Sequence, residues 1–118
     1  MKTILVVDDA AFMRTNIRYL LEKYDYQVLE AEDVYEATKM YEKHRPDAVT
    51  MDIAMPGKSG IVGVAEIMKL DPDAKIVVIT SMGTEFTIRD AINNGAKNFI
   101  IKPFTEKQLV DVIRSLDK

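Results

Sequence analysis

The 118-residue chain contains no cysteine and no tryptophan, and it has only one histidine. Without cysteine it can form neither a disulfide nor a thiolate metal site, and it offers no cysteine nucleophile. The histidine, His44, precedes Arg45-Pro46 at the end of an expected helix. There it is interpreted as a solvated helix-terminal residue. Chemistry in this protein therefore has to rest on oxygen ligands and amines.

Strong charge imbalance and long apolar runs are also missing. The chain has 16 basic and 19 acidic residues, for a net charge of -3, so nothing indicates nucleic-acid binding. The first apolar run, Ile4 to Val7, is too short for a signal peptide and leads into Asp8-Asp9. No run approaches the roughly 20 residues of a membrane span. We therefore expect one cytoplasmic domain, residues 1–118, with no membrane insertion.

Apolar runs and helical stripes alternate along the sequence. The runs predict strands at 3–7, 27–31, 47–51, 75–80 and 98–101, with Asp52 closing the third. Helical patterns follow each strand, and the apolar stripes expected to be buried include Ile17, Leu21, Val34, Ala37, Tyr41, Val64, Ile88, Ala91, Ile92, Leu109, Val112 and Ile113. Asp33 with Glu36 and Thr105 with Gln108 predict capping boxes. The alternation predicts a parallel sheet with helices on both faces.

Polar residues stand where these predicted strands end. They are Asp8, Asp9, Asp52, Thr80 and Lys102. Because parallel strands end at one edge of the sheet, these side chains are expected to lie together, at the edge where α/β proteins bind ligands. Three crowded carboxylates repel one another, and a cation relieves the repulsion. With oxygen ligands only, Mg²⁺ fits best.

The amine and the hydroxyl point to phosphoryl transfer. A carboxylate can accept a phosphoryl group as a covalent nucleophile, and such transfer depends mainly on positioning and electrostatics. Asp52 is the candidate acceptor. Mg²⁺, Lys102 and the Thr80 hydroxyl could each hold one phosphoryl oxygen.

Over its whole length the sequence resembles the receiver domains of two-component response regulators. The match is carried by Asp8-Asp9, Asp52, Thr80 and the run Phe99-Ile100-Ile101-Lys102-Pro103-Phe104, and the stretch Asp8-Asp9-Ala10-Ala11-Phe12-Met13-Arg14 is most similar to single-domain chemotaxis regulators. The resemblance implies a flavodoxin-like (βα)5 fold, a doubly wound parallel five-stranded sheet in the order 2-1-3-4-5.

The resemblance also implies roles for the site residues. Asp52 matches the phosphoacceptor, and Asp8, Asp9, Asp52 and the Ala54 carbonyl match the Mg²⁺ site, with Asp8 acting largely through water. Thr80 matches the switch hydroxyl, Phe99 the aromatic switch position, and Lys102 the phosphate-binding lysine. Ala54 and Met82 replace polar side chains found in the best-studied chemotaxis members, so dephosphorylation kinetics do not carry over.

The implied function is a phosphorylation-activated response regulator. A chemotaxis-type sensor histidine kinase or a small phosphodonor would phosphorylate Asp52. The change would reshape the surface of the fourth helix, fifth strand and fifth helix, which would control a flagellar-type motor switch or another target. The protein is expected to be a monomer and not a turnover enzyme.

Three other functions remain open from the sequence. A phosphorelay carrier would keep the same chemistry and pass the phosphoryl group to another histidine protein. An aspartyl-phosphate phosphatase usually has a second aspartate two residues after the nucleophile, where this chain has Ala54. A flavin- or nucleotide-binding protein would need a phosphate loop after the first strand, where Asp8-Asp9 would repel phosphate.

Overall fold

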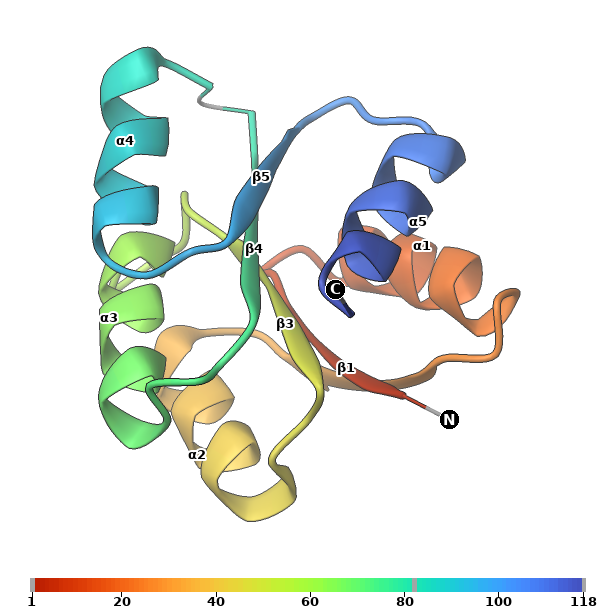
Figure 1. Cartoon of the computed structure of the whole chain (residues 1–118), viewed down its shortest axis with the longest axis horizontal. Helices are drawn as coiled ribbons and strands as arrows, with labels where there is room; N and C mark the ends of the chain where they lie inside the picture. Colours follow the sequence, from red (N-terminus) through yellow and green to blue (C-terminus); the bar gives the residue numbers. More distant parts are fainter. Residues whose placement is uncertain (1, 82, 118) are drawn as a thin grey trace.

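The computed structural model describes residues 2–81 and 83–117. Its elements are β1 (Thr3–Val7), α1 (Ala11–Glu22), β2 (Gln27–Ala31), α2 (Val34–His44), β3 (Ala48–Asp52), α3 (Gly60–Leu70), β4 (Ile76–Thr80), α4 (Glu85–Asn93), β5 (Asn98–Ile101) and α5 (Glu106–Ser115) (Figure 1). The strands form one parallel sheet in the order β2-β1-β3-β4-β5. The predicted fold class and strand order are therefore confirmed. Within the described ranges, no helix combines the length and apolar character needed to cross a membrane.

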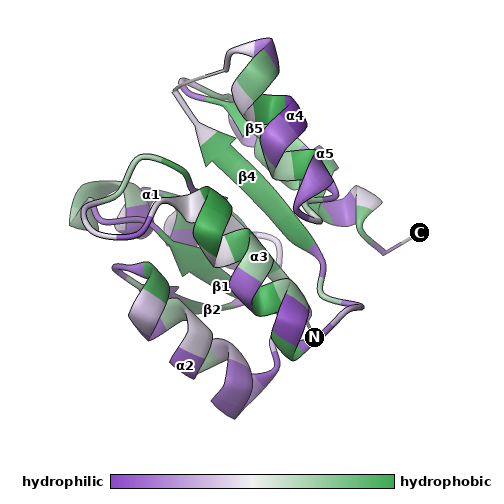
Figure 2. Ribbon diagram, turned by 90° about the vertical axis from the view of Figure 1, so that its left-hand side faces the viewer, coloured by the Kyte–Doolittle hydropathy of each residue, from purple (hydrophilic) through white to green (hydrophobic). Residues whose placement is uncertain are grey.

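The helices form two layers around the sheet. Helices α1 and α5 cover one face, and α2, α3 and α4 cover the other (Figure 1). Strands β3 and β4 are buried along their whole length, which explains their continuous apolar character. Figure 2 shows hydrophobic strands, and helices on which hydrophilic residues gather most clearly in α2 and hydrophobic ones are also visible on the near side of α3. The two helical layers thus bury both faces of the sheet. Polar side chains lie at its carboxyl edge.

The third strand begins and ends one residue later than predicted. Asp47 lies outside β3 and is exposed, and its Oδ2 accepts a hydrogen bond from the Thr3 N–H at 2.8 Å. Asp52, in contrast, belongs to the strand and pairs with Ile79 of β4. The Asp47 N–H does donate to the Thr3 carbonyl at 2.8 Å, but the Asp47 side chain accepts the Thr3 N–H, and the strand begins at Ala48. The shift makes Asp52 part of the ladder.

Most predicted helical stripes are confirmed, but Ile92 is exposed, and Ile88 and Val112 are only half-buried. Ile17 and Leu21 of α1 are buried, as expected. In α4 only Ala91 is buried, and Ile92 is 41% exposed, because this helix packs on the core through a narrow face. In α5 the buried neighbour of Leu109 is Val110, while Val112 is only half-buried.

One of the two predicted capping boxes is complete. Thr105 accepts the Gln108 N–H at 3.1 Å, and the Gln108 side chain accepts the Thr105 N–H at 2.8 Å. Asp33 accepts the Glu36 N–H at 2.7 Å, but the Glu36 carboxylate accepts the Glu32 N–H instead of the Asp33 N–H. The second box is therefore half-formed, although the cap itself is present.

Candidate metal and phosphoryl site

Four strand ends bring polar side chains to one edge of the sheet. Asp8 follows β1, Asp52 ends β3, Thr80 ends β4 and Lys102 follows β5. Asp8, Asp52 and Thr80 are only 2%, 6% and 0% exposed. Burial of a carboxylate carries a large free-energy cost unless partners compensate its charge. This cost argues that the edge is built for a purpose other than stability.

Three carboxylates meet at this edge. Asp8, Asp9 and Asp52 each place one oxygen within 4.8 Å of the other two. Asp9 is exposed, so the group opens to solvent on its side. The structure thus brings together the three carboxylates that the sequence assigned to a metal site.

Lys102 is the cation in this group. Its Nζ donates to Asp8 Oδ2 at 3.0 Å and lies 3.5 Å from Asp52 Oδ1. Asp8 therefore holds the ammonium more closely than Asp52 does. Burial raises the pKa of the Asp52 carboxyl above its ordinary value, and the charge of Asp8 raises it further, while Lys102 opposes the rise. One ammonium does not compensate three carboxylates.

The donor set suits a hard divalent cation. It consists of carboxylate oxygens, and two of the three residues are buried while the third faces water. Mg²⁺ binds to one or two carboxylates and keeps several water ligands. The uncompensated negative charge gives such a cation a favourable environment. The residues present therefore fit Mg²⁺.

The start of α3 packs directly against the Asp52 backbone. A Cβ placed on Gly60 would lie 1.9 Å from the Asp52 carbonyl oxygen, so any larger residue would displace one of the two segments. The Gly60 N–H also donates to the Ile53 carbonyl at 2.9 Å. Sequence reasoning did not identify this contact, although a glycine at the first position of the helix that follows Asp52 was an available signal.

Asp8 is held by four hydrogen bonds in addition to its place after β1. Its N–H donates to the Ala31 carbonyl at 3.1 Å, and its Oδ1 accepts the Ala10 N–H at 2.9 Å. Its carbonyl accepts from Arg14 Nη1 at 2.6 Å, and Lys102 holds Oδ2. Sequence reasoning missed this contact of Arg14.

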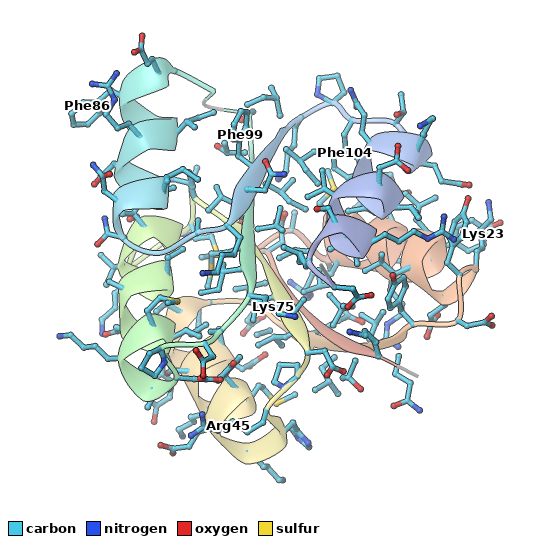
Figure 3. The ribbon with its side chains drawn as sticks, in the orientation of Figure 1. Lys23, Arg45, Lys75, Phe86, Phe99 and Phe104 are labelled. Atoms are coloured by element: carbon cyan, nitrogen blue, oxygen red, sulfur yellow. The ribbon has the colours of Figure 1, made fainter. Side chains whose placement is uncertain are left out.

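The remaining predicted positions lie around this group. Thr80 is fully buried, and its carbonyl accepts the Lys102 N–H at 2.9 Å. Ala54 is exposed two residues after Asp52. Phe99 is 38% exposed on β5 and lines a surface hollow beside α5, and Figure 3 shows it at the same end of the molecule as Phe104. Met82 lies outside the described residues.

The chain was compared with protein families and with known sequences, and both comparisons indicate the same family. The profile of the response regulator receiver domain matches residues 4–114. The chain is 45% identical over 118 residues to the chemotaxis protein CheY of Thermotoga maritima, covering 99% of this chain and 98% of that protein.

Solved structures agree. A CheY from Borrelia burgdorferi, in a complex of CheX, CheY, BeF3 and Mg²⁺, superposes with a TM-score of 0.95 at 30% identity, covering 99% of this chain and 90% of that chain. The response regulator TrrA of Thermotoga maritima, with Mg²⁺ and BeF, gives a TM-score of 0.91 at 33% identity, covering 98% of this chain and 99% of that chain.

Proposed function

The chain belongs to the response regulator receiver family, and we propose that it accepts a phosphoryl group on Asp52 with Mg²⁺ bound at Asp8, Asp9 and Asp52. Membership supports phosphorylation-dependent two-component signalling. The observation that carries the finer proposal is the arrangement at the sheet edge. There the buried carboxylates of Asp52 and Asp8 share the ammonium of Lys102, and the exposed carboxylate of Asp9 lies beside them.

The proposed reaction uses this arrangement directly. An Asp52 oxygen forms a bond to phosphorus while the bond between phosphorus and the donor atom breaks, and the donor leaves with that electron pair. Lys102, already 3.5 Å from Asp52, pairs with one oxygen of the transferred group. The Thr80 hydroxyl, on the strand beside Asp52, meets a second oxygen. Mg²⁺, when bound, supplies charge that stabilises the phosphoryl oxygens.

The phosphoryl group must come from outside the chain. The single histidine, His44, ends α2, immediately before the segment that leads into β3. It therefore lies at the edge of the sheet where strands begin, while Asp52 lies where they end. A partner histidine kinase of the chemotaxis type, or a small phosphodonor such as acetyl phosphate, fits this requirement. We also propose that the protein works in the cytoplasm as a monomer and does not turn over external substrates.

The response is proposed to appear on the α4-β5-α5 surface. Thr80 precedes α4 in the chain and pairs with Ile101 of β5, so a movement of its hydroxyl toward phosphate affects both elements. Phe99 on β5 would then turn inward. The target would be a motor switch or another signalling protein, in keeping with relatives named as chemotaxis proteins.

Intact-mass spectrometry after incubation with acetyl phosphate and Mg²⁺ tests the proposal. We expect one labile phosphoryl adduct in the natural protein and none in Asp52→Asn. The matched control is Asp73→Asn, which changes an exposed aspartate in the loop after α3 and should keep the adduct. An adduct that survives Asp52→Asn would contradict the assignment of the acceptor. Absence of any adduct in the natural protein would contradict the proposed function.

A further inference from the structure

A polar network joins α1, β2 and the end of β1 beside the carboxylate group. Arg14 Nη1 donates to the Asp8 carbonyl at 2.6 Å, and Arg14 Nε donates to Glu30 Oε1 at 3.1 Å. Arg18 Nε donates to the other Glu30 oxygen at 2.7 Å. The Arg14 side chain is only 16% exposed. One guanidinium therefore bridges a strand-end carbonyl and a carboxylate of the neighbouring strand.

The carbonyl that Arg14 holds is in the peptide unit between Asp8 and Asp9. Because a peptide unit is planar, the direction of this carbonyl fixes where the Asp9 Cα lies relative to Asp8. The Asp8 side chain is fixed independently by Ala10 and Lys102. Asp9 has an exposed side chain and depends on its backbone for position. Arg14 thus sets the backbone from which the exposed carboxylate of the group extends.

Arg14 pairs with Glu30, which also binds Arg18, and it makes no ion pair with the carboxylate group as Lys102 does. Its contact with Asp8 is to a neutral carbonyl, and its ion pair is with Glu30. A guanidinium donates in fixed directions, whereas the single ammonium of lysine cannot span two such acceptors in the same way. The contribution of Arg14 is therefore geometric.

We propose that Arg14, oriented by Glu30, is a positioning residue for the Mg²⁺ site, acting through the Asp8–Asp9 peptide unit. This inference rests on the proposed function, because it requires that the carboxylate group bind Mg²⁺. Replacing a group that hydrogen-bonds to a metal ligand and orients it typically lowers metal affinity by about 10- to 100-fold. Arg14 touches neither metal nor phosphoryl group.

Isothermal titration calorimetry with Mg²⁺ alone tests this proposal on the whole chain. Arg14→Lys should raise the dissociation constant by about tenfold, the lower end of that range. The matched control is Arg18→Lys, since Arg18 lies one turn further along α1 and bonds to the same carboxylate without reaching Asp8. Its dissociation constant should stay within about twofold of the natural value, because no contact to the ligands changes. Asp9→Asn, which removes a carboxylate, gives the reference for lost binding.

A second variant keeps the test valid if Arg14→Lys does not fold. Glu30→Gln retains Arg14 but removes the charge that orients it, and it should also weaken Mg²⁺ binding. Amide chemical shifts of the metal-free protein add a readout independent of metal. Asp9 and Ala10 amides should shift in Arg14→Lys and Glu30→Gln and stay unchanged in Arg18→Lys.

The outcomes separate this inference from the proposed function. Mg²⁺ binding in the natural protein with an unchanged dissociation constant in Arg14→Lys, or in Glu30→Gln when only that variant folds, would overturn the positioning role alone. Equal weakening by Arg14→Lys and Arg18→Lys would also overturn it. No Mg²⁺ binding in the natural protein, together with no phosphoryl adduct, would overturn both proposals.

Discussion

The helices α1 and α4 are attached to the sheet in different ways. Helix α1 buries Ile17 and Leu21, and its arginines bond to β2 and to the end of β1. The residues after it, Lys23 and Tyr24, bond to Glu106 at the start of α5 at 2.7 and 2.6 Å. Apolar and polar contacts therefore both tie this helix to other elements.

Helix α4 buries only Ala91. Thr84 with Thr87, Arg89 with Glu85, and Asn94 with Asp90 bond within the helix and its caps. Apolar side chains are exposed along it, and Figure 3 shows Phe86 pointing away from the molecule. The next strand, β5, adds the partly exposed Phe99 and Ile101.

This difference has a consequence for signalling. Segments with few buried contacts open or shift at a smaller free-energy cost than well-packed ones. A phosphoryl group on Asp52 would lie between the two regions, with Asp8 on the α1 side and Thr80 on the α4 side. We therefore expect α4 and β5 to move on phosphorylation while α1 keeps its place.

The largest expected effect compares matched isoleucine truncations in the two helices. Ile17 of α1 is 1% exposed, and Ile92 of α4 is 41% exposed. Ile17→Ala should lower the free energy of unfolding by about 2–5 kcal/mol, through lost burial and the cavity left behind. Ile92→Ala should change it by less than about 0.5 kcal/mol. Urea denaturation measures both. Equal losses would show that α4 is packed as firmly as α1.

A second effect concerns the charge where the two regions meet. The pKa of Asp52 is raised in the folded protein, first by burial and then by Asp8. A raised carboxyl pKa gives stability that is present below the unfolded pKa, near 3.9. That stability is lost as pH rises through the folded pKa. The ionised Asp52 therefore destabilises the metal-free protein at pH 7.

Asp52→Asn removes that cost, so the variant should be more stable than the natural protein at pH 7 in EDTA. The gain should shrink as pH approaches the unfolded pKa, about 3.9. Denaturation curves at several pH values measure it, with Asp73→Asn as the exposed control. A variant less stable than the natural protein at pH 7 would contradict the charge argument.

The smallest expected effect comes from removing one hydroxyl next to α1 and one in α4 and comparing the two losses of stability. Tyr24→Phe deletes the hydrogen bond that joins the segment just after α1 to Glu106 and should cost about 0.5–1.5 kcal/mol. Thr87→Val deletes the hydroxyl of a half-buried residue whose side-chain hydrogen bond, in the contacts described, is an exposed one to the α4 cap Thr84, and it should cost less than about 0.5 kcal/mol. Thermal unfolding resolves the pair. A larger loss in Thr87→Val would reverse the comparison.

The sequence was sufficient to predict features that depend on local pattern. Continuous apolar runs predicted the buried strands, and strand–helix alternation predicted the parallel sheet. Asp8, Asp52, Thr80 and Lys102 stand at or just after the ends of these strands. Because all strands of a parallel sheet end at the same edge, the topology predicted that the four side chains lie together. The candidate site residues could therefore be grouped from the sequence without any distance.

Contacts between distant residues could not be predicted in this way. Arg14 meets Glu30 across 16 positions, and no periodicity links them. Ile92 was misassigned because an apolar stripe predicts which face of a helix is buried but not how many residues of that face contact the core. In α4 only Ala91 is buried. Asp47 was placed in β3 because its side-chain bond to Thr3 leaves no local signal.

Hydrogen–deuterium exchange followed by mass spectrometry tests the contrast between α1 and α4 most directly. The comparison is between metal-free protein and protein with Mg²⁺ and beryllofluoride as the phosphoryl mimic. We predict that exchange changes in peptides covering α4 and β5, while peptides covering α1 beyond its first turn keep their metal-free rates. Changes in α1 as large as those in α4, or no change in α4 and β5, would contradict this account.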